Sequence, residues 1–75
     1  MFNQPNYRVM AAPYPDGGWR VFHPGTKTLA DIAERDDIKF FMAKWICRKT
    51  GDPIENVHVL LDVVSASEIV AAENV

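Results

Sequence analysis

Apolar and polar residues alternate in two short segments on either side of a Pro/Gly-rich break. Residues 7–11, YRVMA, and residues 19–23, WRVFH, both follow a period of two. Such alternation on both sides of a turn segment is typical of a β-hairpin. The break contains residues 15–18, PDGG, in which Pro presets φ, Asp bonds its own backbone and Gly accepts a positive φ. We therefore predict two strands joined by a tight turn.

The next segment, residues 28–35 (TLADIAER), fits two structures. Thr28 and Asp31 resemble a capping box, so one long helix could extend from residue 28 to residue 50. That helix would place Asp36 on its apolar stripe, and burial of an unpaired carboxylate is costly. In the second structure, residues 28–34 form a third strand and the helix begins at Asp36 or Asp37. We favour the strand followed by the helix, and the sequence leaves both open.

A helical period of apolar residues continues from residue 38 to residue 46. Acidic residues precede it and basic residues crowd its end, as the helix dipole prefers. Gly51 is a natural stop. The apolar stripe, which we expect to be buried, consists of Ile38, Phe41, Met42, Trp45 and Ile46.

Residues 57–64, VHVLLDVV, predict a further strand that is largely apolar on both faces. Such a strand is expected in the centre of a sheet or covered on both sides. Ser65 and Glu68 then form a capping-box pattern for a short C-terminal helix.

The predicted fold class is therefore α+β: a small antiparallel sheet in the order β-β-β-α-β, with one helix packed on one face and a short C-terminal tail helix. We expect a single domain over residues 1–75, with a core over about 6–64 and a tail over 65–75.

Composition narrows the possible functions. The chain has 75 residues, of which 48% are hydrophobic and 24% charged, and a formal net charge of −2. This charge provides no general attraction for nucleic acid. Dimerisation would bury more surface, so a homodimer fits a chain of this size. Cys47 is the single cysteine, which excludes an intrachain disulfide and favours a reducing compartment. We find no signal peptide or membrane-spanning stretch, and expect a cytoplasmic protein that does not interact with a membrane.

Several turn and core positions together resemble the small, single-domain HicB-like antitoxins of bacterial and phage genomes. They lie in residues 7–25, YRVMAAPYPDGGWRVFHPG, and in residues 36–61, DDIKFFMAKWICRKTGDPIENVHVLL. The resemblance implies a β-β-β-α-β sheet with one helix across it, and a protein that binds and blocks a small RNA-cleaving toxin, HicA. Many such antitoxins also carry a C-terminal DNA-binding segment. Here only eleven residues follow residue 64, none of them Lys or Arg, so we do not expect that segment.

Catalytic, metal-binding and cofactor-binding residues are not expected. The double glycine lacks a phosphate-loop motif and precedes a strand rather than a helix. His23 and His58 each lack a nucleophile or a second ligand at a diagnostic spacing, so we expect both at the surface or rim. The chain is therefore not expected to be an enzyme.

A second apolar stripe lies on the long helix, roughly opposite the first. It consists of Phe40, Ala43 and Cys47. One helix cannot bury two opposite apolar faces on one sheet. Either the tail residues Ile69 and Val70 cover this stripe, or it binds a partner or a second copy.

Basic residues flank this stripe, and the candidate partner-binding residues are Phe40, Ala43, Lys44, Cys47 and Arg48. Basic and aromatic residues also alternate in nucleic-acid-binding proteins. Because Phe41 and Trp45 are assigned to the buried stripe, we favour a solvated helix flank over a nucleic-acid surface.

The sequence thus favours a non-enzymatic protein-binding module that occludes a partner protein, as a HicB-like antitoxin occludes its toxin. The alternative is a phage or mobile-element inhibitor of an unrelated host protein. A small nucleic-acid-binding module is the less favoured third hypothesis.

Overall fold

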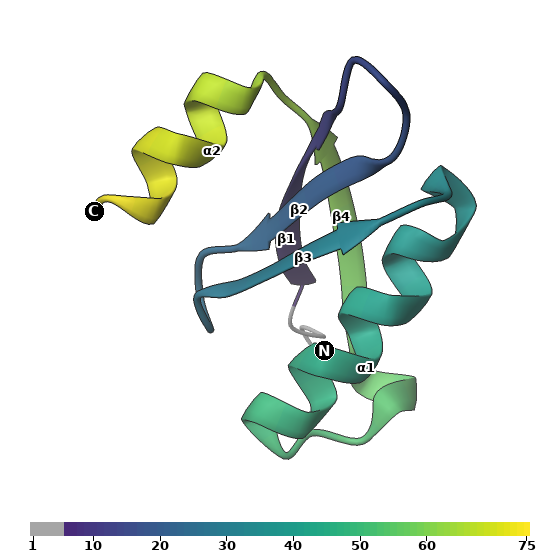
Figure 1. The fold of residues 1–75 in the computed structure, drawn as a ribbon. Coiled ribbons are helices and arrows are strands. Elements are labelled where there is room, and N and C mark those ends of the chain that lie inside the picture. The colour runs from purple at the N-terminus through teal and green to yellow at the C-terminus, as the bar shows by residue number, and fades with distance from the viewer. Residues whose placement is uncertain (1–5) are drawn as a thin grey trace.

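The computed structural model describes residues 6–75 and contains one four-stranded sheet with two helices (Figure 1). The strands are arranged in the order β3-β2-β1-β4. The elements are β1 (Asn6–Pro13), β2 (Trp19–His23), β3 (Thr28–Ile32), the 3-10 turn η1 (Arg35–Asp37), α1 (Ile38–Thr50), the 3-10 turn η2 (Ile54–Asn56), β4 (His58–Val63) and α2 (Ala66–Glu73). The α+β class and the β-β-β-α-β order are confirmed.

The hairpin forms where the alternation predicts it. β1 and β2 are antiparallel, with Met10 opposite Phe22. In the turn, Gly17 and Gly18 have φ values of 106° and 85°, and the Tyr14 N–H donates to the Gly18 carbonyl at 3.0 Å. A side chain would strain both glycines at these φ values.

Residues 28–32 form a strand, so the strand-then-helix interpretation is confirmed. η1 follows, and α1 begins at Ile38, one or two residues after the predicted start. Gly51 ends α1 in the left-handed conformation, with φ at 80°.

The sheet is mixed, which corrects the prediction of an antiparallel sheet. β4 is parallel to β1, with Val9 opposite Leu61. α1 returns the chain along the sheet after β3, so β4 runs in the same direction as β3. Because β3 and β1 already run in one direction, β4 adds beside β1 as a parallel strand. The prediction of a central or doubly covered β4 is also wrong, because β4 forms an edge of the sheet and Leu60, on one of its faces, is 51% exposed.

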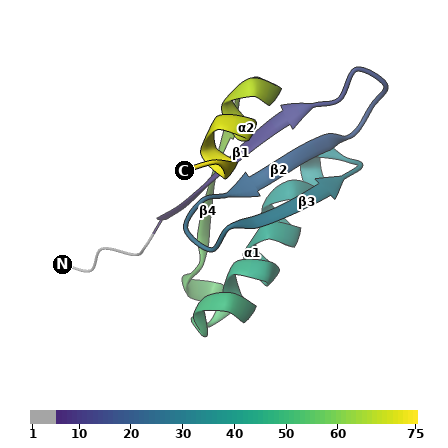
Figure 2. The same cartoon turned by 60° about the vertical axis from the view of Figure 1, so that its left-hand side comes forward.

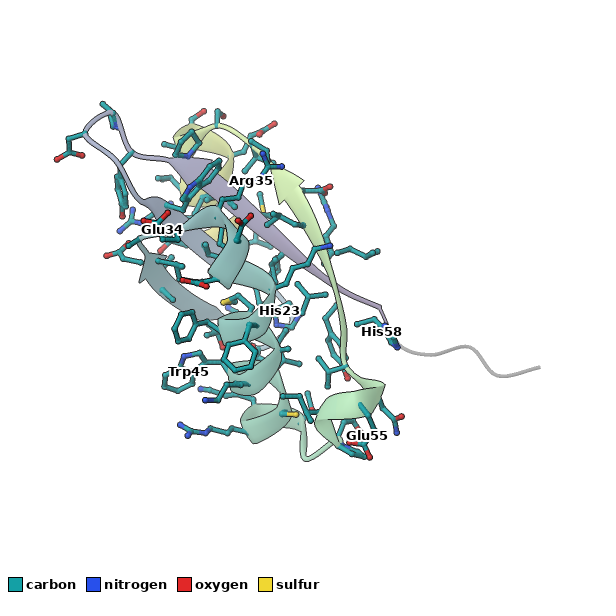
Figure 3. All side chains as sticks on the ribbon, turned by 90° about the vertical axis from the view of Figure 1, so that its right-hand side faces the viewer. His23, Glu34, Arg35, Trp45, Glu55 and His58 are labelled. Atoms are coloured by element: carbon teal, nitrogen blue, oxygen red, sulfur yellow. The ribbon has the colours of Figure 1, made fainter. Side chains whose placement is uncertain are left out.

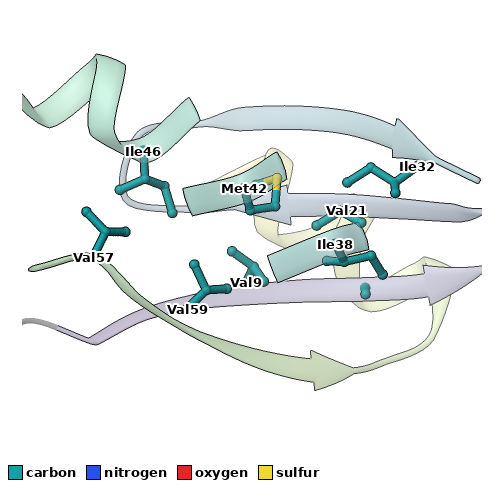
Figure 4. Packing of buried hydrophobic residues seen from close by; sticks show 9 residues of the cluster. Val9, Val21, Ile32, Ile38, Met42, Ile46, Val57 and Val59 are labelled. Carbon is teal, nitrogen blue, oxygen red and sulfur yellow. The ribbon is translucent and has the colours of Figure 1, made fainter. Parts of the chain in front are cut away.

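The larger core lies between α1 and one face of the sheet (Figure 4). Ile38, Met42 and Ile46 are fully buried at intervals of four residues, and they pack on Val9, Val21 and other buried strand residues. Complete burial of one such aliphatic side chain contributes about 1.5–3 kcal/mol. This stripe therefore holds α1 on the sheet.

Two members of the predicted buried stripe are not buried, which corrects that prediction. Phe41 and Trp45 are each 43% exposed. They lie on the flank of α1 beside Ala30 and Ile32, where β3 ends the sheet. No strand lies beyond β3 within residues 6–75 to cover them.

α2 packs on the opposite face of the sheet from α1 (Figure 2). Its Ile69 is fully buried in a second cluster with Met10, Ala12 and Phe22. The predicted capping box is confirmed, because the Ser65 hydroxyl accepts from the Glu68 N–H and the Glu68 carboxylate accepts from the Ser65 N–H. The interpretation that Ile69 covers the second stripe of α1 is therefore wrong.

His23 is buried, which corrects its prediction as a surface residue. Its side chain is 5% exposed, with the Tyr7 ring edge-on at 5.7 Å between centroids. The Thr26 N–H donates to His23 Nδ1 at 3.2 Å, so the proton of the neutral ring is on Nε2. Burial lowers the pKa of His23 below its usual 6.5 because the charged ring loses solvation.

Candidate protein-binding surface on α1

The outward face of α1 carries three exposed aromatic side chains. Phe40 is 59% exposed, beside the half-exposed Phe41 and Trp45. Trp45 projects from the side of α1 away from β4 (Figure 3). We call Phe40, Phe41, Lys44, Trp45 and Arg48 the aromatic patch. An exposed cluster of this kind is typical of an interaction surface.

Two cations lie over the rings of this patch. Lys44 Nζ is 5.2 Å from the centroid of the Phe40 ring, and the Arg48 guanidinium carbon is 5.5 Å from the Trp45 ring. Phe40 and Phe41 meet edge to face at 5.9 Å. Cation–π contacts at exposed sites contribute about 0.5–1 kcal/mol each. The contacts therefore order the long basic side chains beside the rings before any partner binds.

The charge of α1 is one-sided. The helix contains Lys39, Lys44, Arg48 and Lys49, which are four of the chain's eight Lys and Arg, and none of its ten Asp and Glu. Although the net charge of the chain is −2, α1 is basic and the rest of the chain is acidic. A basic surface of this kind favours partners with an acidic surface.

A shallow hollow of about 420 Å³ adjoins the aromatic patch at the edge of the sheet. Phe41 and Trp45 form its α1 wall, and β3 and the residues just after it form the other, including Ala30 and Ile32. An aromatic wall beside a strand edge is a common site for peptide or protein docking.

The predicted site residues do not form one surface. Phe40, Lys44 and Arg48 lie in the aromatic patch, whereas Ala43 and Cys47 are half-buried against the larger core. Ala43 and Cys47 therefore expose less apolar surface than predicted, although Ala43 lines a surface hollow together with Phe40. Sequence reasoning missed the exposure of Phe41 and Trp45, because each follows a buried residue of the stripe by three positions and so shares its helical period.

Cys47 and Asp52 belong to the structural support beneath the helix end. The Cys47 thiol donates to the Asp52 carbonyl at 3.1 Å, and the Tyr7 hydroxyl donates to the Asp52 carboxylate at 2.6 Å. This hydrogen bond raises the pKa of Tyr7. The network ties the start of β1 to the loop after α1.

Two further polar residues of the described chain lie outside the aromatic patch. His58 is exposed, as predicted, while the Tyr14 hydroxyl donates to Asp31 at 2.5 Å and this bond raises the pKa of Tyr14. Within residues 6–75, no group of three His, Cys, Asp or Glu side chains converges to hold a metal ion. None of the helices in this part of the chain is long and apolar enough to cross a membrane.

Comparison of the chain with protein-family models, with curated proteins and with solved structures found no match.

Proposed function

We propose that the chain is a non-enzymatic protein-binding module that occludes the surface of a partner protein through the aromatic patch of α1. The observation that carries the proposal is the exposure of three aromatic rings with two cations over them. Trp and Arg are enriched among residues that dominate binding energy at interfaces. The similarity to HicB-like antitoxins adds a toxin-like, RNA-cleaving protein as the partner class.

Occlusion requires only surface complementarity. The rings of Phe40, Phe41 and Trp45 would lose water on contact, and the surrounding Lys44 and Arg48 would pair with carboxylates of the partner. The remaining surface of this small domain would then block access to the covered part of the partner.

Nucleic-acid binding is the second candidate, and the exposure of Phe41 and Trp45 favours it. The sequence argument against it assumed that both rings were buried, whereas each is 43% exposed beside basic residues. Exposed rings and adjacent cations are the elements of single-strand binding. Retention on heparin that falls steeply with salt would favour this candidate over protein binding.

The test begins with affinity capture from the native host and identification of the captured protein by mass spectrometry. Binding of the purified partner is then measured for the native chain and for a Trp45→Ala, Arg48→Ala double variant. We expect the double variant to raise Kd by about thirtyfold or more, the loss of about 2 kcal/mol typical of a central interface residue.

Val70→Ala is the matched control, because Val70 is an exposed apolar residue on α2, across the sheet. It should leave Kd within about twofold. Equal binding by the double variant, with an unchanged melting temperature, would contradict the proposal. A partner whose RNA cleavage the chain does not inhibit would contradict the toxin class and leave an unrelated host protein as the target.

A further inference from the structure

β4 has a sequence typical of an internal strand but lies at the edge of the sheet. Its residues, HVLLDV, are mostly apolar on both faces, as in strands that have neighbours on both sides. In the chain it pairs on one side only, with β1. Leu60 is 51% exposed and Val63 53% exposed on opposite faces of the strand. Exposed apolar edge strands invite pairing with another strand.

The open side of β4 offers a row of hydrogen-bonding groups. The Val64 N–H donates to the Ala11 carbonyl of β1 at 2.9 Å. The backbone N–H and C=O groups of the even-numbered residues of β4 therefore point toward β1. The backbone groups of Val59, Leu61 and Val63 consequently point away from the sheet. No residue within the described part of the chain, 6–75, forms backbone hydrogen bonds with these groups.

A hollow lies along this open side. Residues 57–60 line it consecutively, together with Lys39, Phe40 and Ala43 of α1. Consecutive residues of a strand point to alternate faces, so a hollow that contacts all four lies at the strand's edge. His58, labelled in Figure 3, marks the start of β4 at this edge.

We propose that two copies of the chain pair through their β4 strands to form a continuous eight-stranded sheet. The two β4 strands are antiparallel, and the two-fold axis passes between the two Leu60 residues. In this register Leu60 lies opposite Leu60 of the second copy, and the remaining opposed pairs are His58 with Asp62, Val59 with Leu61, and Val57 with Val63. Each pair is apolar with apolar or His with a carboxylate, and such cross-strand pairs stabilise a sheet. The carboxylate of Asp62 also accepts a hydrogen bond from Arg8 of its own chain, on the same face.

The hydrogen-bonding geometry fits this register. Val59 and Leu61 both point outward, so they form a hydrogen-bonded pair, and Leu60 forms the non-hydrogen-bonded pair at the two-fold axis. A shift by two residues in either direction removes both matches on that face, because Leu60 would then lie opposite Asp62 or opposite His58. Self-pairing therefore selects one register.

The other sheet edge lacks this self-complementarity. β3 reads Thr-Leu-Ala-Asp-Ile, and antiparallel self-pairing places Asp31 opposite either Leu29 or its own copy. Like charges directly opposite destabilise a sheet. A second copy at β4 also makes that strand central, which accounts for its apolar sequence.

The first test measures oligomeric state by size-exclusion chromatography with light scattering, for the full chain from about 1 to 500 µM. We expect a dimer, and expect Leu60→Lys to raise the dimer dissociation constant about tenfold or more by placing two ammonium groups at the axis. Leu29→Lys is the matched control, because Leu29 is exposed on the same face of the opposite edge strand. It should leave the dimer intact.

The second test measures register by cysteine cross-linking in a Cys47→Ser background. Leu60→Cys places the two thiols on strands with Cα atoms about 4.5 Å apart, within the range of a disulfide. His58→Cys is the control, because its thiols would lie about 13 Å apart along the strands. Oxidation should cross-link the first variant and not the second.

Three results would overturn the proposal. A native chain that stays monomeric at every concentration would exclude self-pairing and leave β4 for a foreign strand. A dimer sensitive to Leu29→Lys rather than Leu60→Lys would assign the interface to β3. A dimer that Leu60→Cys fails to cross-link would exclude the proposed register. The test needs no partner protein, so its result is independent of the proposed function.

Discussion

At the scale of single residues, the burial of His23 makes the stability of the fold depend on pH. Its ring is neutral in the fold, packed against Tyr7 and bonded by the Thr26 N–H, with a pKa below the usual 6.5. The unfolded chain binds the proton first as pH falls, so stability rises with pH between the two pKa values. The contribution is fully present above about pH 6.5 and is lost as pH falls through the lowered folded pKa.

We therefore expect His23→Gln to reduce the loss of stability on acidification below pH 6.5. Urea unfolding at several pH values between 7 and 5 measures the slope. Equal slopes for His23→Gln and the native chain would contradict the assignment of a buried neutral ring.

Gly25 packs directly on the same ring. A Cβ atom at this position would lie 2.9 Å from His23 Cε1, closer than side-chain atoms pack. The ring cannot move away cheaply because it is buried, so we expect Gly25→Ala to destabilise the fold by about 1–3 kcal/mol. A double-mutant cycle with His23→Ala checks the cause. If the cost of Gly25→Ala stays the same without the ring, the close contact is not its source.

At the scale of elements, local patterns were enough to predict nearly all of the strands and helices. The hairpin, β3 and the capping box of α2 each depend on residues close together in sequence. Burial depends instead on where the sheet ends. Phe41 and Trp45 share the helical period of the core stripe, but lie beside β3 at the edge of the sheet, so their exposure is a tertiary property. For the same reason, the sequence did not predict that these two aromatic residues belong to the exposed patch.

The docking of α2 depends on one residue more than any other. Ile69 is fully buried between Met10, Ala12 and Phe22, on a face of the sheet that α1 does not cover. We expect Ile69→Ala to cost about 2–5 kcal/mol, the usual loss for truncation of a buried Ile. Chemical denaturation measures it. Val70→Ala, on the exposed side of the same helix, should change stability by less than about 0.5 kcal/mol.

At the scale of the whole molecule, the proposed dimer determines where both aromatic patches lie. Antiparallel pairing of two β4 strands in one sheet relates the copies by a two-fold axis perpendicular to that sheet. Both α1 helices then lie on one face and both α2 helices on the other. Phe40 lines the hollow along β4 and would adjoin the seam, whereas Phe41 and Trp45 lie on the flank of α1 that adjoins β3. Each copy therefore keeps these two rings open for a partner. The dimer would thus offer two binding surfaces to one side.

Association and folding are coupled in such a dimer. A chain of 75 residues has a folding stability of about 4–11 kcal/mol, so the energy of a strand–strand interface is a substantial addition. By mass action, a tenfold increase in concentration adds about 0.7 kcal/mol per chain. For a domain of this size that raises Tm by about 3–5 °C.

Scanning calorimetry at 20 and 200 µM should show this shift for the native chain and for Leu29→Lys. Leu60→Lys should melt below both chains at each concentration, because its edge strands repel and its dimer dissociates more readily. A Leu60→Lys dimer with the dissociation constant of the native dimer would mean that another surface, rather than β4, holds the two copies together.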